Sequence, residues 1–188
     1  MAGTEDAVRR FLAGDKEAFT WIVRRWEKKV YNLAWRLLGN KEDAQDIAQE
    51  TFLSVFKSIG NLREPKSFST WLYRITLNHC RARWRYQVAG ISLDDGPPGV
   101  AGGDNVEYSP GIVSRDAADS LITLDLIRKA LMKLSEDQRT AIVLKEYLGL
   151  TLEEVAGMMD CPLSTAKSRL YQGLRDMQRS LKRMGVRF

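Results

Sequence analysis

The stretch TLEEVAGMMDCPLSTAKSRLYQ, residues 151–172, decides the fold of the C-terminal part of the chain. Thr151 and Glu154 have the spacing of a capping box, which predicts that a helix begins there. Apolar residues then recur at helical spacing as far as Met159. Pro162 cannot continue a helical hydrogen-bond ladder and restricts the residue before it. The sequence therefore predicts a short helix that ends in a tight turn.

A second helix is predicted directly after this turn, capped by Ser164 or Thr165. Its spacing gives it one apolar side and one polar, basic side. The apolar side holds Ala166, Leu170, Leu174 and Met177, and the outer side holds Lys167, Ser168, Tyr171 and Arg175. The pattern is typical of a helix-turn-helix whose second helix lies in a DNA major groove. A packed helical hairpin that contacts no nucleic acid is the alternative.

The charge of the chain is unevenly distributed. The 188 residues carry a net charge of +5. No acidic residue lies between Glu64 and Asp94, and Asp176 is the only acid from Cys161 to the end. Two basic zones in a chain of this length suit one large or two small domains that bind an anionic partner.

Several classes of protein are disfavoured. Cys80 and Cys161 lie far apart without the spacing of a metal site, so we expect neither a zinc site nor a disulfide framework. His79 precedes Cys80, but neighbouring helical residues point in different directions, so thiol activation is not expected. No nucleophile set or phosphate loop is visible, and no apolar run is long enough to span a bilayer. We expect a cytoplasmic protein without enzyme activity, cofactor or membrane insertion; a redox role for either cysteine stays open.

The first half of the chain predicts consecutive amphipathic helices. Residues 1–12 predict a short helix, and a long helix runs from a cap at Asp15 to Gly39. The next helix runs from a cap at Asn40 to Gly60. Its predicted buried side holds Ala44, Ile47, Ala48, Thr51, Phe52, Val55, Phe56 and Ile59. The opposite side carries Asp43, Asp46, Gln49, Glu50 and Leu53, which form either a solvated surface or a docking face for a basic partner.

Residues 62–69 predict a loop, since Pro65 interrupts them, and residues 70–86 predict another helix. The inward stripe of this helix holds Tyr73, Leu77, Cys80 and Trp84, and one outer face holds Trp71, Arg74, Asn78, Arg81 and Arg85. Arginines neutralise phosphates, an aromatic ring stacks on bases, and an amide contacts a base edge, so this face suits nucleic acid. A core tryptophan beside a solvated basic face is the alternative.

A flexible linker is predicted at residues 88–115, around DDGPPGVAGGD at 94–104. A helix from about Asp116 follows, and Ser135 with Gln138 forms a second capping box. The predicted apolar side of these helices holds Leu121, Leu124, Ile127 or Arg128, Leu131, Leu134, Ala141, Ile142, Leu144 and Leu148. The predicted fold is all-α, with two small helical domains, 1–87 and 116–188, joined by the linker.

Three motifs, in this order, resemble a bacterial RNA polymerase sigma factor of the extracytoplasmic-function (ECF) group of the sigma-70 family. They are DAQDIAQETFLSVFKSI at 43–59, FSTWLYRITLNHCRARWR at 68–85, and the run from LSEDQ to RDMQ at 134–178. The resemblance covers nearly the whole chain. It implies a sigma region 2-like domain followed by a sigma region 4-like helix-turn-helix domain.

The resemblance also implies roles for particular residues. Contact with the clamp of the largest polymerase subunit is implied for Asp46, Gln49, Glu50 and Leu53. Contact with the −10 promoter element is implied for Lys66, Ser69, Trp71, Arg74, Asn78, Arg81 and Arg85, with Arg83 also holding the DNA backbone. Contact with the −35 element is implied for Ser164, Thr165, Lys167, Ser168, Arg169, Tyr171, Gln172 and Arg175. Relatives often have a basic residue where Gln172 stands, so the −35 sequence is not transferable.

The partners that the resemblance implies are core RNA polymerase, at its clamp and flap, promoter DNA, and an anti-sigma factor. The implied regulon is a stress or envelope response. Two rivals come from other classes. A promoter-binding regulator would bind DNA without polymerase, and an RNA-binding or assembly adaptor would bind unrelated nucleic acids with similar affinity.

Overall fold

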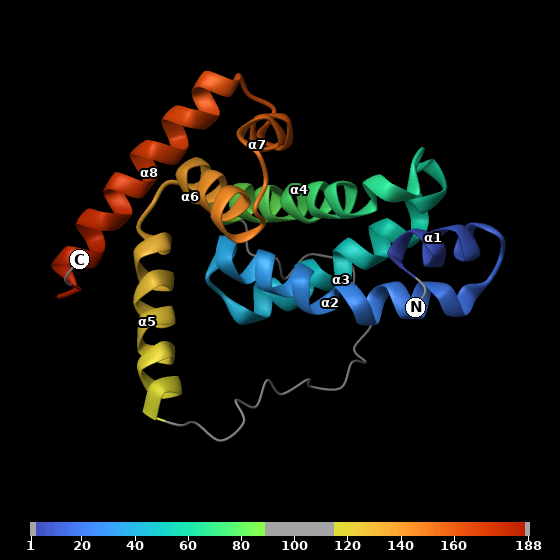
Figure 1. The fold of residues 1–188 in the computed structure, drawn as a ribbon, viewed down its shortest axis with the longest axis horizontal. Coiled ribbons are helices and arrows are strands. Elements are labelled where there is room, and N and C mark those ends of the chain that lie inside the picture. Colours follow the sequence, from blue (N-terminus) through green and yellow to red (C-terminus); the bar gives the residue numbers. More distant parts are fainter. Residues whose placement is uncertain (1–2, 89–114, 187–188) are drawn as a thin grey trace.

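The computed structural model describes residues 3–88 and 115–186, and in these two ranges all regular structure is helical (Figure 1). We call 3–88 the first half and 115–186 the second half. The all-α prediction is confirmed. The predicted linker, apart from its end residues, lies outside the described ranges.

The first half contains four α-helices and two short 3₁₀ turns. They are α1 (Thr4–Leu12), α2 (Lys16–Leu38), α3 (Lys41–Ser58), η1 (Ile59–Asn61), η2 (Pro65–Ser67) and α4 (Phe68–Val88). Both predicted caps are confirmed. The Asp15 carboxylate accepts hydrogen bonds from the backbone N–H groups of residues 17 and 18, at 3.0 and 3.3 Å, and the Asn40 side chain accepts from residues 42 and 43 at 2.8 and 3.3 Å. Gly39 ends α2 in the left-handed conformation, with φ of 76°.

The second half contains the helix-turn-helix. Its elements are α5 (Arg115–Met132), α6 (Glu136–Ile142), a π-helical segment η4 (Val143–Tyr147), α7 (Leu152–Met159) and α8 (Leu163–Arg183). Both predicted capping boxes, Ser135 with Gln138 and Thr151 with Glu154, are present with reciprocal hydrogen bonds. The turn between α7 and α8 holds Asp160 in the left-handed conformation.

Four sequence-based predictions need correction. The predicted cap at Ser164 or Thr165 is wrong, because α8 already begins at Leu163 with Pro162 at the cap position. The helix predicted from residue 70 begins at Phe68, and Pro65–Ser67 form a 3₁₀ turn within the predicted loop. Phe56 and Leu124 were expected in the core, but they are 54% and 50% exposed.

The core has two parts. One lies around Trp26 and Phe68, between α1, the first part of α2, the end of α3 and the start of α4. The other joins the two halves, because side chains from the ends of α2 and α4 pack with those of α5 to α8. Figure 1 shows α6 and α7 at one end of α4, and α1 at the opposite end of the first half. The two halves are therefore packed together.

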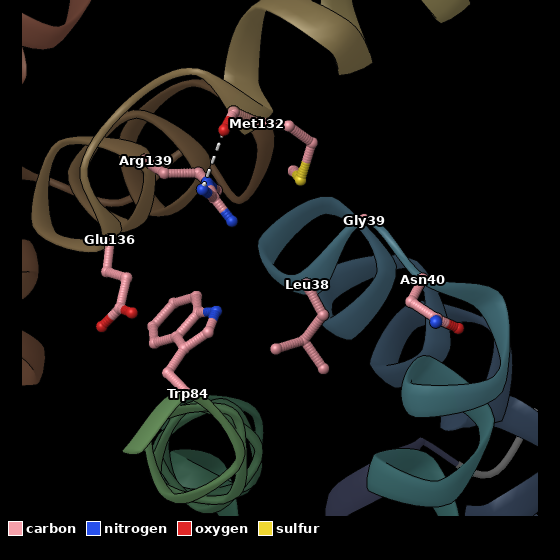
Figure 2. A pocket seen from close by; sticks show the side chains of 7 residues that line it. All are labelled: Leu38, Gly39, Asn40, Trp84, Met132, Glu136 and Arg139. Carbon is pink, nitrogen blue, oxygen red and sulfur yellow. Dashed lines mark hydrogen bonds between the residues drawn. The ribbon is translucent and has the colours of Figure 1, made fainter. Parts of the chain in front are cut away.

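The seam between the halves depends on close contacts. A Cβ atom at Gly39 would lie 2.3 Å from the Met132 sulfur, so only glycine fits at this position without movement of Met132. The guanidinium of Arg36 lies over the Tyr147 ring, 4.1 Å from its centre. An open hollow of about 450 Å³ remains at the seam, bordered by Trp84 from α4, by the end of α2 and by Arg139 (Figure 2).

Candidate nucleic-acid interface

The outer face of α4, which we call the −10 face, consists of Trp71, Arg74, Asn78, Arg81 and Arg85. Arg74, Asn78 and Arg85 are exposed, and Trp71 is half-buried with its ring centre 6.1 Å from that of Phe68. The opposite side of the helix is fixed in the core by Leu77, Cys80 and Trp84, as the apolar stripe predicted. The core thus holds α4 in the rotation that presents an aromatic ring, an amide and two arginines to solvent.

The remaining members of the predicted −10 set are placed differently. Arg81 is half-buried, and it donates a long hydrogen bond of 3.5 Å to the backbone oxygen of Met158 on α7. Lys66 is exposed and forms an ion pair of 3.2 Å with Glu64, and Ser69 is half-buried in the first turn of α4. Packing of the two halves therefore engages Arg81 and leaves the rest of the −10 face accessible.

Arg83 does not belong to this face, although the resemblance implies that it holds the DNA backbone together with Arg74, Arg81 and Arg85. Its side chain is only 11% exposed and points to α3, where it pairs with Asp43 at 2.7 Å. Asp46 and Glu50 lie farther from its guanidinium, each at 3.6 Å. Three carboxylates around one largely buried cation join α3 to α4. Arg83 is thus a structural residue.

The outer face of α3, which we call the docking face, consists of Asp46, Gln49, Glu50 and Leu53. All four are exposed, and Leu53 is the most exposed large apolar side chain in the part of the protein that the structure describes, at 61%. His79 of α4 lies beside this face, with Nδ1 3.1 Å from the Glu50 carboxylate and Nε2 2.9 Å from the Ser54 hydroxyl. The hydrogen bond with His79 lowers the pKa of Glu50, although partial burial acts in the opposite direction. Glu50 therefore stays charged at neutral pH.

Cys80 is separate from His79, as the helical geometry predicted. Its side chain is fully buried, and burial raises the pKa of the Cys80 thiol to about 12. A protonated and inaccessible thiol is a poor nucleophile and a poor redox sensor. Cys161, in the turn before α8, is half-buried and free.

The exposed side of α8, which we call the −35 face, carries most of the predicted residues. Tyr171 is 53% exposed. Thr165 and Arg169 are half-buried, and Arg169 forms an ion pair of 2.6 Å with Asp137 of α6. The other members are exposed: Ser164, Lys167, Ser168, Gln172 and Arg175. Helix α8 packs on α6 at Gly173, where a Cβ atom would lie only 3.0 Å from the Ile142 side chain.

The hollow at the seam is not suited to bind an anion, although Arg139 borders it (Figure 2). Arg139 is buried, and each of its three guanidinium nitrogens donates to backbone carbonyl oxygens, those of Leu37, Leu131, Met132 and Leu134. Leu37 belongs to the first half, and the other three carbonyls lie at and just after the end of α5. Arg139 is a packing element that ties the halves together.

The sequence analysis missed two features, the ion pairs of Arg83 and the exposure of Phe56. The four-residue spacing of Arg74, Asn78, Arg81 and Arg85 leaves Arg83 out, and this spacing indicates that Arg83 faces another way.

Phe56 lies one turn after Leu53 and extends the docking face. One side of its ring contacts Phe11 and Phe19, at ring-centre distances of 5.6 and 5.1 Å. No local pattern distinguished this half-covered phenylalanine from a core residue.

Comparison with known proteins identifies the family of the chain. Residues 22–89 match the family model for sigma-70 region 2, and residues 124–177 match the model for sigma-70, region 4. The ECF RNA polymerase sigma factor SigW of Bacillus subtilis is 34% identical over 179 residues, which cover 93% of this chain and 95% of SigW. The RNA polymerase sigma-H factor of Pseudomonas aeruginosa is 31% identical over 185 residues, with 95% and 93% coverage.

Two solved structures share the fold. CnrH, in complex with the cytosolic domain of CnrY, has a TM-score of 0.65 at 20% identity, and the match covers 95% of this chain and 97% of CnrH. RpoE of Bartonella quintana, in complex with the anti-sigma factor NepR, also has a TM-score of 0.65, at 24% identity and with coverage of 87% and 96%. In the described ranges no helix has the length and apolarity that crossing a bilayer requires. Matched along almost its full length by RNA polymerase sigma factors, this chain belongs to the ECF group of the sigma-70 family and acts in transcription initiation.

Proposed function

We propose that this sigma factor brings core RNA polymerase to promoters through three surfaces. The docking face on α3 binds the clamp of the largest subunit, the −10 face on α4 binds and opens the −10 element, and the −35 face on α8 binds the −35 element. The observation that supports this division is the placement of the three faces. They lie largely exposed on three different helices of one molecule, and Arg81 is the predicted −10 residue for which the described ranges show a hydrogen bond to the other half.

The deciding experiment is run-off transcription. The purified full-length chain is mixed with core polymerase that lacks its own specificity subunit, and fragments of the source genome serve as templates. We expect discrete transcripts only when both proteins are present. A sequence-specific footprint by the chain alone, without any transcript, would instead identify a regulator that works without polymerase. Failure to co-purify with core polymerase would overturn the proposal.

Promoter opening follows from a balance of energies at the −10 face. Unstacking one base costs a few kcal/mol, roughly 2–4. Stacking on an aromatic side chain returns about 1–3 kcal/mol per base, and a good contact with a base edge returns a comparable amount. For the matching base, the free energy returned by the contacts balances the cost of unstacking. For another base, the base-edge contact is missing and the cost of unstacking is not recovered. Recognition and opening are therefore one step, carried by Trp71, Asn78 and the loop at residues 62–69.

Replacing Asn78 by alanine is expected to slow opening of a matched promoter about tenfold, since one base-edge contact is lost. Asn78 is exposed, so the fold and core binding persist. Permanganate reactivity of unpaired thymines measures opening. The matched control is Gln178→Ala, which removes an exposed amide from α8. An unchanged rate for Asn78→Ala would remove Asn78 from the −10 contacts.

Replacing Lys167 by alanine is expected to weaken −35 binding and to reduce the salt dependence of affinity by about one phosphate contact. Lys167 is exposed on α8. Binding of holoenzyme to a duplex −35 probe is measured over a series of salt concentrations. Lys133→Ala, an exposed lysine outside the −35 face, serves as the control. Equal slopes for the two variants would exclude a phosphate contact by Lys167.

Regulation is proposed to depend on an anti-sigma factor that competes with core polymerase for the docking face. Two points support this. The RpoE structure of the same fold contains the anti-sigma factor NepR. The docking face also presents Leu53 and, one turn further, Phe56, two exposed apolar side chains that a partner would bury. Because its partners are polymerase and promoter DNA, the chain acts in the cytoplasm.

A further inference from the structure

His79 is the only histidine of the chain, and the function proposed above gives it no role. It directly follows Asn78 on α4, but its ring contacts α3. Nδ1 lies 3.1 Å from the Glu50 carboxylate, and Nε2 lies 2.9 Å from the Ser54 hydroxyl. Glu50 and Ser54 are one turn apart on α3. A single ring therefore holds two consecutive turns of the helix that bears the docking face.

The partners of the His79 ring suit both of its charge states. A carboxylate only accepts hydrogen bonds, so Nδ1 carries a hydrogen and donates to Glu50. In the neutral ring, Nε2 accepts a hydrogen bond from the Ser54 hydroxyl. In the protonated ring, Nε2 donates to the same hydroxyl oxygen, because a hydroxyl group both donates and accepts. His79 therefore gains or loses a proton without any change in the packing of α3 on α4.

Glu50 connects His79 to the cluster of ion pairs between α3 and α4. Arg83 lies at the centre of this cluster, with its guanidinium 2.7 Å from an Asp43 oxygen and 3.6 Å from an Asp46 oxygen. Glu50 also lies 3.6 Å from this guanidinium. Three carboxylates and one guanidinium give the cluster an excess of two negative charges, which suits a basic partner at the docking face. A proton on His79 halves this excess.

The ring of His79 is placed where a change of charge has an effect. Its side chain is 26% exposed, so water reaches it, but its charge is only partly screened. Histidine is the side chain that ordinarily changes charge near neutral pH, whereas carboxylates and guanidinium groups ordinarily keep their charge there. The neighbouring thiol of Cys80 stays neutral, because burial raises its pKa to about 12. Near neutral pH, the charge of this cluster therefore depends on His79.

We propose that His79 is a positioning residue of the docking face that makes the binding of core polymerase depend on pH; this rests on the function proposed above. With a neutral ring, the hydrogen bond from Nδ1 holds the Glu50 carboxylate in place and leaves its charge available to a basic partner. With a protonated ring, Glu50 forms an ion pair within the chain, and a basic partner meets one more positive charge. The affinity for core polymerase therefore falls as the pH falls through the range in which His79 gains its proton.

Variants of the full-length chain test this role. His79→Gln keeps a donor and an acceptor but does not gain a proton near neutral pH, and His79→Ala removes both groups. Glu50→Gln, alone and combined with His79→Ala, tests whether His79 acts through Glu50. The control is Lys133→Gln, which changes an exposed lysine of the second half. Titration of fluorescently labelled chain with core polymerase, at about pH 6 and at about pH 8, measures the affinity on either side of the usual histidine range. Circular dichroism checks that each variant is folded.

At about pH 8, the wild-type chain, Lys133→Gln and His79→Gln are expected to bind core polymerase equally well. At about pH 6, the wild-type chain and Lys133→Gln are expected to bind about threefold more weakly than His79→Gln, as one partly exposed charge produces. His79→Ala is expected to bind about threefold more weakly than the wild-type chain at about pH 8, because Glu50 is no longer held. The same substitution is expected to have no further effect in the Glu50→Gln background.

Two results overturn the inference alone. The first is a ratio of wild-type to His79→Gln affinity that is the same at both pH values. The second is an equal effect of His79→Ala with and without Glu50→Gln, which would mean that His79 supports the fold and does not position Glu50. If the wild-type chain bound no core polymerase at either pH, the function proposed above would fail together with this inference, so the two failures are distinguishable.

Discussion

Replacing Arg139 by methionine is expected to lower the free energy of unfolding by about 3 kcal/mol. Arg139 is buried, and it donates to four backbone carbonyl oxygens. Methionine fills similar space without any donor, so all four carbonyls lose the guanidinium donor, although the Leu131 oxygen keeps its hydrogen bond from the Leu134 N–H. Burying a cation costs free energy, and the same burial lowers the pKa of Arg139. We expect the stabilisation by the hydrogen bonds to exceed this cost of burial, because all three guanidinium nitrogens donate.

Urea denaturation followed by circular dichroism measures this loss of stability. Arg139→Lys keeps the charge, but one ammonium group does not reach four oxygens spread over two helix ends, so we expect a loss of the same order. The control is Arg179→Met, which removes an exposed arginine paired with Asp176 and is expected to change stability by less than about 0.5 kcal/mol. If Arg139→Met changed the free energy of unfolding by no more than the control, the guanidinium hydrogen bonds would make no net contribution to stability.

The partners of Arg139 explain why the sequence did not reveal its role. Leu37 is 102 positions away, and the Asp43 partner of Arg83 is 40 positions away. The spacing of Arg74, Asn78, Arg81 and Arg85 indicates that Arg83 faces another way, but no pattern in the sequence identifies the partner of either arginine. Only the packing of the two halves, and of α3 on α4, gives these cations their partners. Periodicity and capping rules concern neighbouring residues, so they do not predict contacts between residues that are far apart in the sequence.

Features set by neighbouring residues were predicted well. The caps at Asp15 and Asn40 and the two capping boxes involve a side chain and a backbone group two or three residues apart, so the sequence contains both partners. The start of α8 shows where this reasoning ends. Two hydroxyl residues follow Pro162, and either has the chemistry of a cap. Asp160 in the left-handed conformation, however, turns the chain so that the helix begins one residue before Ser164.

Phe56 and Leu53 show a similar limit on the docking face. Spacing placed Phe56 with the buried residues of α3, because Phe52 and Ile59 lie on neighbouring positions of the helix. Phe11 and Phe19 cover one side of its ring, and the rest remains exposed. The docking face therefore has a larger apolar part than its acidic residues suggested. A surface of this composition binds through desolvated apolar contacts, with charges that set orientation.

Replacing Leu53 by aspartate is expected to weaken binding of core polymerase about 50-fold, or by about 2–3 kcal/mol. Leu53 is 61% exposed, so the folded chain loses little, whereas a partner that buries the leucine loses an apolar contact and meets a buried carboxylate beside Glu50. Titration of fluorescently labelled chain with core polymerase measures the affinity.

The matched control is Leu124→Asp, which changes a leucine of 50% exposure on α5 and is expected to bind core polymerase normally. If both variants bound core polymerase as tightly as the wild-type chain, the polymerase contact would lie away from Leu53. If both bound more weakly, the cause would be damage to the fold, and urea unfolding curves of the two variants test this. A loss confined to Leu53→Asp, with the Asp46 and Glu50 carboxylates intact, would place the polymerase contact at Leu53 and show that acidic charge alone does not make the docking face bind.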